Sequence, residues 1–384
     1  MGKQVDGDDI VSILEYFKDL EDPRSHINRL HLLSDLIVIC ISAVLAGADG
    51  PKAIGMWANS NEVWLRQYLT LPNGIPSHDT IGRLLATLHP RAFQQCFSAW
   101  LRSIQRANDL QADDTIAIDG KALRRSHDQK NQLGPLFLVS AWSTQHGISL
   151  GQLATAEKSN EITAIPELIK LIDVKKAIVT IDAAGCQRNI AEQIIEQGGD
   201  YVLALKGNQG TLHQNVCNWI VDQWDHDFDG VDVRSCETTG KGHGRREHYT
   251  YYQFKIPKDF PGRDKWRRLR TAGFAVRTSE QNGTETGDIR HFISSLPLGV
   301  KRFANAVRSH WGIENSLHWC LDVTFREDES RVRDRFAADN LAWLKRFAIS
   351  LLKQQKDKES IAMRRRMAGW NPDYLTQVLG IKAT

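Results

Sequence analysis

The chain has 384 residues, of which 41% are hydrophobic and 25% are charged, and its formal net charge is +3. This balance excludes a disordered, collagen-like or coiled-coil chain, and it is too weakly basic to indicate a nucleic-acid binder by itself. Six scattered cysteines without a Cys-x-x-Cys pair favour reduced thiols over a disulfide framework or a zinc ribbon. The sequence shows no apolar signal segment at its start, and its longest apolar run, 36–46, is too short to span a membrane. We therefore expect a cytoplasmic protein.

The first part of the chain carries the periodicity of amphipathic helices. Apolar residues recur at helical spacing over 10–17 and again over 93–104, and the run 36–46 is typical of a buried helix. Turn-forming residues at 71–76 separate two shorter amphipathic pieces. The sequence therefore predicts an all-helical N-terminal domain over residues 1–110.

Near residue 113 the pattern changes to short apolar or alternating runs of the kind that form strands. Three such runs follow one another without a helix, and strand and helix patterns then alternate. The predicted strands are Thr115–Asp119, Leu136–Trp142, Ile148–Ala154, Ala177–Ile181 and Tyr201–Leu205. The predicted helices are Glu161–Ile172, Arg188–Gln197 and Thr211–Trp224. This order predicts an α/β fold, more closely an α+β mixed sheet covered by helices.

Later segments complete the predicted organisation. Residues 226–295 show alternating strand patterns and Gly-rich turns without a long helical pattern, and helical periodicity returns over 303–322 and 340–353. From Lys345 to Thr384 there are nine Lys or Arg against three Asp or Glu. We predict five parts in chain order: the helical N-terminal domain 1–110, a first core part 111–225, a β-rich insertion 226–295, a helical last core part 296–350 and a basic C-terminal tail 351–384.

Two aspartates end predicted buried strands and precede small residues, Asp119 before Gly120 and Asp182 before Ala183. An acid at the carboxyl end of a strand can point into the crevice where sheet proteins bind ligands. If the sheet is of the RNase H type, the first and fourth strands are neighbours and the two carboxylates lie close together. A divalent cation such as Mg²⁺, which takes oxygen ligands, offsets the cost of placing like charges together. The alternative is two unrelated turn or capping aspartates.

A third acid, Glu314, lies in the aromatic-rich helical segment 310–319, after the β-rich insertion. It follows Trp311 by three residues, so it flanks the face that Trp311 and Leu317 are expected to bury. The alternative is a solvated surface glutamate, which is the usual fate of glutamate on a helix.

Basic residues gather on the insertion. From Arg234 to Arg270 there are eleven Lys or Arg against four Asp or Glu, and glycines among them let the backbone approach phosphates. The alternative is a solvated charged loop. Further candidates follow the first acid or the fifth strand, where a plain turn is the alternative. The candidate DNA-binding residues are Lys121, Arg124, Lys206, Asn208, Gln209, Lys241, Arg245, Arg246, Arg308 and His310.

Six strings in fixed order carry a resemblance that runs over essentially the whole chain. They are AIDGKALRRS, EKSNEITAIP, TIDAAGCQRNIAEQI, DYVLALKGNQ, KGHGRRE and RSHWGIENSLHWCLDVTFREDESRVR. With them the sequence resembles the bacterial insertion-sequence DDE transposases, in particular the group that includes the H-repeat-associated proteins. The helical start, with EYFKDLEDPR and LPNGIPSHDTIGRLL, is similar to that group's N-terminal associated domain.

The resemblance implies an RNase H-like catalytic core that is interrupted by a β-rich insertion before its third acid. It assigns the catalytic and metal-binding triad to Asp119, Asp182 and Glu314. The implied activity is Mg²⁺-dependent cleavage and transfer of DNA strands, with Mn²⁺ as a substitute and two ions per site, Asp119 bridging both. The implied partners are double-stranded DNA at the element's terminal inverted repeats and a second copy of the chain in a homodimeric synaptic complex. The implied location is the cytoplasm, at the nucleoid and away from membranes.

One departure from the family pattern bears on the third acid. The wider superfamily often places its glutamate in the pattern Tyr-x-x-Arg-x-x-x-Glu-x-x-x-x-x-x-Lys, and the corresponding positions around Glu314 hold Val307, His310 and Leu321. On this helix, His310 and the nearby Arg308 are then the candidates for donating hydrogen bonds to DNA phosphates. The departure also keeps two alternatives open, an inactive relic that only binds DNA and an RNase H-like nuclease without strand transfer.

Overall fold

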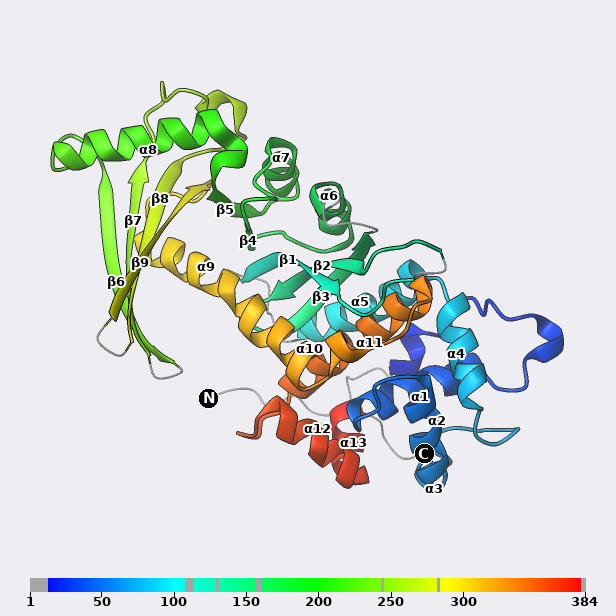
Figure 1. Ribbon diagram of the computed structural model, residues 1–384. Coiled ribbons are helices and arrows are strands. Elements are labelled where there is room, and N and C mark those ends of the chain that lie inside the picture. Colours follow the sequence, from blue (N-terminus) through cyan, green and yellow to red (C-terminus); the bar gives the residue numbers. More distant parts are fainter. Residues whose placement is uncertain are drawn as a thin grey trace.

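The computed structural model describes residues 13–107, 114–128, 131–155, 161–242, 245–281 and 284–380. In this part of the chain, nine strands form one mixed sheet with helices on both faces (Figure 1). The strands are β1 (Thr115–Leu123), β2 (Leu136–Ser143), β3 (Ile148–Thr155), β4 (Ile178–Ile181), β5 (Asp200–Leu205), β6 (Val233–Gly242), β7 (Arg245–Lys255), β8 (Thr271–Gln281) and β9 (Thr284–Ser294). No helix among the described residues is long and apolar enough to cross a bilayer.

The helices fall into three groups along the chain. Those before the sheet are α1 (Leu33–Leu45), α2 (Pro51–Ser60), α3 (Glu62–Leu65), α4 (His78–Thr87) and α5 (Pro90–Ala107). Those between the strands are α6 (Glu161–Leu171), α7 (Arg188–Glu196) and α8 (Gly210–Asp225). Those after the sheet are α9 (Val300–Ile313), α10 (Trp319–Val323), α11 (Arg335–Lys353), α12 (Ile361–Trp370) and α13 (Pro372–Leu379).

The strands have the order β3-β2-β1-β4-β5-β9-β8-β7-β6. β1, β4 and β5 run parallel, and the other neighbouring pairs are antiparallel. The first and fourth strands are therefore neighbours, as the RNase H-like prediction requires. The β-rich insertion joins the same sheet, because residues 202–205 of β5 pair with residues 291–294 of β9. Core and insertion thus share one continuous sheet.

The burial of the strands explains why the core has this order. β4 consists of Ile, Val, Thr and Ile and is buried at every residue, as expected of a central strand between two parallel neighbours. Along β1 the side chains alternate between the two faces of the sheet. Ile116 and Ile118 belong to the hydrophobic cluster of α6 and α7, whereas Ala117 belongs to the cluster of α11.

Two helical layers enclose the sheet. α6 and α7 cover one face of the core strands, and α9 and α11 cover the other (Figure 1). α8 lies across the insertion strands, where its Val216 shares a hydrophobic cluster with Phe254 and Phe274. On the opposite face, Phe303 of α9 clusters with Tyr251 of β7. Because α9 also contacts β1 and β4, one helix spans both the insertion and the core.

The N-terminal helices share their core with the end of the chain. One hydrophobic cluster joins α1, α2, α4 and α5 to α11, α12 and α13. The buried amide of Asn340 in α11 donates to the carbonyls of Leu85 and Leu88 at the end of α4, at 2.9 and 2.8 Å. The predicted helical N-terminal region and α/β class are confirmed, while the five domain boundaries remain a prediction.

The basic C-terminal segment is folded, and two of its arginines point inward. Arg365 is buried, pairs with Asp49 at 2.9 Å and donates to carbonyl groups at the end of α1. Arg364 is also buried and pairs with Asp357 at 2.7 Å. Arg366 is the exposed member of this run. Two of the positive charges of this segment are therefore neutralised inside the protein.

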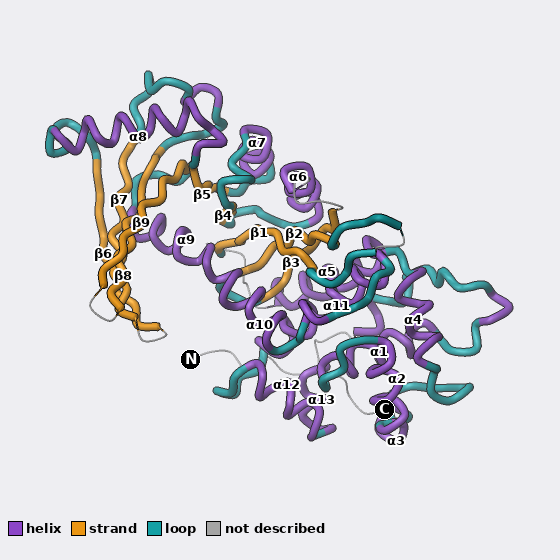
Figure 2. Tube along the Cα trace, in the orientation of Figure 1, coloured by secondary structure: helices purple, strands orange, loops and turns teal. Residues whose placement is uncertain are grey.

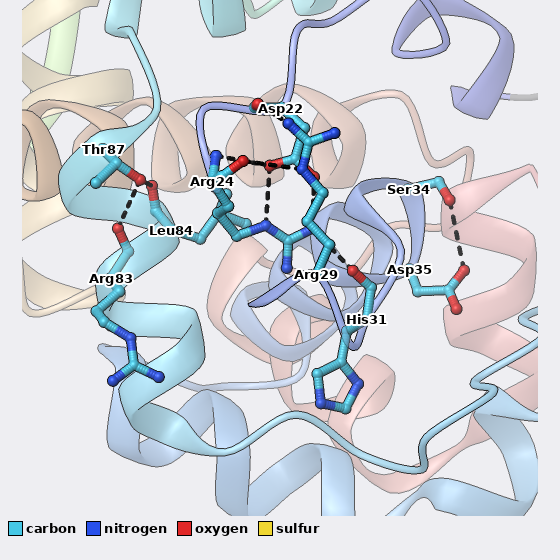
Figure 3. Close-up of polar contacts among 9 residues, drawn as sticks. All are labelled: Asp22, Arg24, Arg29, His31, Ser34, Asp35, Arg83, Leu84 and Thr87. Atoms are coloured by element: carbon cyan, nitrogen blue, oxygen red, sulfur yellow. Dashed lines mark hydrogen bonds and ion pairs between the residues drawn. The ribbon is translucent and has the colours of Figure 1, made fainter. Parts of the chain in front are cut away.

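A pair of arginines shapes the loop before α1 (Figure 3). Arg24 binds both carboxylate oxygens of Asp22, at 2.9 and 2.7 Å, and the carbonyl oxygen of His31 at 2.8 Å. Arg29 donates to the carbonyls of Arg24 and Asp22, at 2.9 and 2.7 Å. These contacts fold residues 22–31 onto themselves and fix the approach of the chain to α1.

Candidate active site

Asp119 and Asp182 lie next to each other at a step in the sheet. The parallel pairing of β1 and β4 ends with Ile118 opposite Ile181, one residue before each aspartate. Neighbouring strands lie about 4.8 Å apart, so this register places the two acids on adjacent strands at the same height. Asp119 does not end its strand as expected, because β1 continues along β2 to Leu123 after β4 has stopped. The acids therefore lie where one strand outlasts its neighbour.

Both aspartates belong to the face of the sheet that α9 covers. Side chains alternate along a strand, so Asp119 shares the face of Ala117, which packs in the cluster of α11. Thr180, two residues before Asp182, lies with its hydroxyl 3.2 Å from Nδ1 of His310 on α9. The two carboxylates are thus directed toward the helical layer that also carries the third acid.

Hydrogen bonds hold the loop that carries Asp182. Its Oδ1 accepts two backbone N–H groups of the same loop, at 2.9 and 3.3 Å. Asn208 and Gln209, two of the DNA-binding candidates, donate their side-chain amides to this loop. Asn208 donates to the carbonyl of Ala183 at 2.5 Å, and Gln209 donates to that of Cys186 at 2.9 Å. The Lys-Gly-Asn-Gln turn after β5 therefore supports the position of Asp182.

The third acid begins a π-helical turn. The regular helix predicted over 303–322 is interrupted: α9 ends at Ile313, a π turn covers Glu314–His318, and α10 follows. Each residue of an α-helix turns the chain by about 100°, so positions four residues apart drift by about 40° around the helix. The wider π turn reverses part of this drift and keeps His310, Glu314 and His318 on one side. Such turns are rare and occur frequently at functional sites.

This side of the helix faces the two aspartates. His310 contacts β4 through Thr180, and Nδ1 of His318 lies 3.5 Å from Oδ2 of Asp119. Glu314 lies between the two histidines along the helix and is exposed. The three acids do not form a group whose oxygens all lie within 4.8 Å of one another.

Burial and like charge act together on Asp119. Burial has the largest effect and raises the pKa of Asp119, and the negative charges of Asp182, Glu161 and Glu314 raise it further. The backbone N–H of Gly120 opposes them, and the resulting pKa is about 7. The charges of the other two candidate acids therefore converge on Asp119.

The two histidines near the acids carry no positive charge that would balance the carboxylates. Burial lowers the pKa of His310 to about 4, and the charge of Arg290 acts in the same direction. Burial lowers the pKa of His318 to about 3, with Arg346 and Lys121 adding to the effect. Both imidazoles are neutral near pH 7. The negative charge of the carboxylates is therefore not balanced by the histidines, and a bound cation would balance it.

A fourth acid, Glu161, was not singled out from the sequence. It is the first residue of α6 and only 4% of it is exposed. A Cβ added to Gly120 would lie 2.6 Å from its Oε1, so Glu161 packs directly against the residue that follows Asp119. Acidic residues are common in the first turn of a helix, because they stabilise it. Nothing in the sequence therefore indicated that Glu161 lies near Asp119.

Two family models match the chain. Residues 110–352 match the Transposase DDE domain, and residues 14–101 match the model described as DDE_Tnp_1-associated. The chain belongs to the DDE transposase family. It is 37% identical over 379 residues to "H repeat-associated putative transposase YhhI" of Escherichia coli strain K12, covering 97% of this chain and 98% of that protein. It is 38% identical over 375 residues to "Putative transposase YncI" of Escherichia coli O157:H7, covering 96% and 95% respectively.

These matches confirm the family, the fold class and the class of enzyme expected from the resemblance. Transposases of this family act on DNA and use divalent metal ions. Which residues of this transposase bind the metal and the DNA is argued from the geometry of the acids, described above, and from the positions of the basic candidates, described next.

Two basic residues near Asp119 differ in their availability. The transposase holds Lys121 among three carboxylates, with its Nζ 2.7 Å from Asp322, 3.3 Å from Glu327 and 3.0 Å from Asp328. Arg124 pairs with Asp328 at 3.1 Å, but 79% of its side chain is exposed. Lys121 is an internal counter-ion here, which does not support its predicted contact with DNA, whereas Arg124 remains accessible.

The insertion strands of the transposase extend past the edge of the sheet where the acids lie. β9 pairs with β5 only over residues 291–294, although it begins at Thr284. Because β5 runs parallel to β4, residues 284–290 continue beyond the carboxyl ends of the core strands, by roughly 20 Å at about 3.3 Å per residue. Figure 2 shows β6–β9 reaching past α9 in this way.

This topology divides the basic segment of the insertion into two regions. The first region is the projecting end of β6 and β7, called the β6–β7 turn below. It includes Lys241, Arg245 and Arg246, whose side chains lie outside the described part of the transposase. Arg267 and Arg268 follow the other end of β7, and Nη2 of Arg268 lies 3.7 Å from Asp200 at the start of β5. Only the first region therefore lies on the side of the acids.

The remaining candidates lie on β5 and α9. Lys206 is exposed directly after β5, and the exposed Arg308 places its guanidinium 5.2 Å above the ring of Tyr249 in the insertion. Val307 and Leu321, which replace the Tyr and Lys of the wider pattern, are buried in the core. These two positions face away from solvent in this fold, so their substitution removes no surface contact of the transposase.

A polar cleft of about 600 Å³ lies at the other ends of the core strands. Thr115 and Ile178, the first residues of β1 and β4, line it together with Arg302 and Asn305 of α9. It is separated from the acids by the length of these strands, so we do not assign the reaction to it.

Proposed function

We propose that the transposase cleaves and joins DNA strands at the terminal inverted repeats of its own element, and that Asp119, Asp182 and Glu314 hold the metal ions for this reaction. One observation carries the proposal. The register of β1 and β4 puts the two aspartates on neighbouring strands, and Glu314 lies between His310, which contacts Thr180 of β4, and His318, which contacts Asp119.

The donor set fits Mg²⁺, with Mn²⁺ as a substitute. The three side chains offer carboxylate oxygens, which are the ligands that hard cations prefer. We propose two ions per site, which the carboxylates of Asp119, Asp182 and Glu314 would hold together. When bound, such ions activate the attacking water or 3′-hydroxyl and stabilise the leaving oxygen.

The chain itself positions the acids for this chemistry. The backbone N–H groups of its loop hold Asp182, and the amides of Asn208 and Gln209 hold that loop. The neutral imidazoles of His310 and His318 fill the space around the acids without cancelling their charge. The site therefore keeps the net negative charge that attracts divalent cations.

The DNA partner is inferred from the exposed basic residues. Arg124 follows β1 and Lys206 follows β5, so both lie at the carboxyl ends of the core strands, and the β6–β7 turn projects on the same side. Lys and Arg contacts to phosphates supply binding that does not depend on sequence. An element has two ends, and each requires its own set of acids, so we propose a homodimer as the working assembly.

A cleavage assay on element-end DNA tests the proposal, and short inverted repeats flanking the gene would define the substrate. We expect the wild type to cut in Mg²⁺ and to be inactive in EDTA. Asp119→Asn, Asp182→Asn and Glu314→Gln should each abolish cutting, while Asp222→Asn, an exposed aspartate on α8, should leave it unchanged. Normal cutting by Asp182→Asn would show that the assignment is wrong.

The products distinguish the proposal from its rivals. Joining of the cut end to a second duplex supports a transposase that performs both steps. Cutting without joining supports an RNase H-like nuclease, and binding without cutting by the wild type supports an inactive relic.

A further inference from the structure

A group of sulfur and nitrogen ligands lies away from the acids, where α8 meets β9. His213 and Cys217 are one turn apart on α8, and His291 lies on β9 opposite Leu205 of β5. Sγ of Cys217 lies 3.5 Å from Nε2 of His213 and 3.8 Å from Nε2 of His291. Among the described residues, these three are the potential ligands found within 4.8 Å of one another.

The spacing of the three atoms matches one face of a tetrahedron around zinc. With a Zn–S distance of about 2.3 Å and Zn–N distances of about 2.0–2.1 Å, tetrahedral ligands lie roughly 3.5 Å apart along an S···N edge and roughly 3.4 Å apart along an N···N edge. Both S···N distances are therefore already close to the bound values. The distance between the ligand nitrogens of the two histidines, which is at most 4.8 Å, is the one that would shorten on binding.

We propose that His213, Cys217 and His291 bind one Zn²⁺ ion, with water in the fourth position. A thiolate and two imidazoles suit zinc and disfavour Mg²⁺, which prefers oxygen ligands. All three side chains are half-buried, so an ion can enter from solvent and keep a water ligand. The site is therefore independent of the carboxylates in ligand chemistry and in position.

The place of the site in the fold indicates what the ion does. α8 is the last element before the insertion, and β9 is the strand by which the insertion joins β5. A metal bound by both ties the start of the insertion to its end. The ion thus fixes the joint between the insertion and the core, without taking part in the reaction at the acids.

The ordinary alternative is a trio held by weak sulfur hydrogen bonds. A thiol can donate its one hydrogen to one imidazole and accept an N–H from the other, which satisfies both contacts without metal. The two explanations differ in one respect that can be measured, because only metal binding converts the thiol into a metal-bound thiolate.

Titration of the full-length, EDTA-treated protein with Co²⁺ as a probe for zinc provides the test. We expect a thiolate-to-cobalt charge-transfer band that saturates at one ion per chain and disappears when Zn²⁺ is added. Cys217→Ser should remove the band and weaken Zn²⁺ binding by more than about 100-fold. Cys236→Ser is the matched control, because Cys236 is a half-buried cysteine of the insertion that belongs to another cluster and whose Sγ lies 4.0 Å from the Val300 carbonyl oxygen.

Absence of the charge-transfer band in the wild type, or an unchanged band in Cys217→Ser, would overturn the proposal. If Cys217→Ser does not fold, as judged by circular dichroism, His213→Gln provides the same measurement at a half-buried position on α8. Weaker Zn²⁺ binding by His213→Gln supports the site, and unchanged binding overturns it. Cobalt held by the three acids does not confuse the result, because carboxylate oxygens give no sulfur-to-cobalt charge-transfer band, and loss of the band in Cys217→Ser identifies the thiolate.

Discussion

Arg346 donates through Nη1 to Oε1 of Glu327 at 2.7 Å, in a part of the interior where the two side chains are 0% and 2% exposed. Arg346 also donates to the hydroxyl of Ser140 on β2, at 3.2 Å. The ion pair therefore ties α11 to the sheet and to the short turn Glu327–Glu329. It lies beside Lys121, on the face of the sheet that carries Asp119.

Replacing one partner of this pair should destabilise the transposase strongly. Arg346→Met leaves the carboxylate of Glu327 buried without its closest counter-ion, and breaking a buried pair in this way costs about 3–5 kcal/mol. Denaturant unfolding measures the effect. The double variant Arg346→Met/Glu327→Gln should recover much of the loss, because it removes both charges. Equal stability of the single variant and wild type would contradict a structural role for the pair.

The same pair should make stability depend on pH in the acid range. Burial alone would raise the pKa of Glu327, but the charges of Arg346, Lys121 and Lys345 outweigh burial and lower the pKa to about 2. A carboxylate whose pKa is lower in the folded state stabilises the fold above its unfolded pKa of about 4.5. This stabilisation is lost as the pH falls from about 4.5 toward about 2. The unfolding free energy of Arg346→Met/Glu327→Gln should therefore change less over this interval than that of the wild type.

Gly120 should not tolerate a side chain. A Cβ at this position would overlap the ring of Phe137 and lie 2.6 Å from Oε1 of Glu161, next to Asp119. We expect Gly120→Ala to lower the unfolding free energy by about 1–3 kcal/mol, as overpacking does, and to reduce cleavage. Gly134→Ala is the matched control, since a Cβ there meets nothing within 4 Å. Similar stability of the two variants would mean that the packing around Gly120 adjusts easily.

Asp182→Asn should separate folding from activity. The substitution removes a negative charge beside Asp119, and the remaining amide oxygen can still accept the two N–H groups of the loop. We expect an unfolding free energy within about 1 kcal/mol of the wild type, or slightly higher, together with loss of Mg²⁺-dependent cleavage. A large loss of stability would instead indicate that Asp182 is chiefly a structural residue.

The salt dependence of DNA binding should locate the basic surface of the insertion. Neutralising Arg245, Arg246, Arg267 and Arg268 together should lower the slope of log K against log salt by more than about one unit, because each phosphate contact contributes about 0.9. The topology assigns this effect to the β6–β7 turn. Arg245→Gln/Arg246→Gln should therefore reproduce it, whereas Arg267→Gln/Arg268→Gln, at the other end of β7, should leave the slope nearly unchanged. The opposite result would place the DNA along the amino ends of the core strands.

Much of the fold could be predicted because its signals are local. The β-branched run at 177–181 identifies a central strand, and the alternation of strands and helices around it predicts the mixed sheet. The continuation of β1 beyond Asp119 could not be predicted, because it depends on pairing with β2. The π turn at Glu314 was equally hidden, since the apolar spacing over 303–322 also fits a regular helix.

Contacts between residues that are far apart in the chain could not be predicted from the sequence. In the sequence Arg365 is one of several basic residues of the C-terminal segment, yet in the fold it pairs with Asp49, more than three hundred residues earlier. His291 meets His213 and Cys217 only because the insertion returns to pair with β5. The positions of Asp119 and Asp182 were more accessible to prediction, because an acid at the end of a buried strand is a local pattern.

The passage of α9 across both the insertion and the core has a consequence for how the enzyme is assembled. Glu314 directly follows this helix, and the cluster that buries the helix includes Tyr249, Tyr251, Ala275 and Phe292 of the insertion strands. Such long-range strand pairing is intrinsically slow to form. During synthesis the aspartate pair exists before the third acid emerges, so a nascent or truncated chain holds an incomplete site. If the three acids act together as proposed, competence to cut DNA is a late event in folding, and a damaged insertion leaves the first two acids without the third.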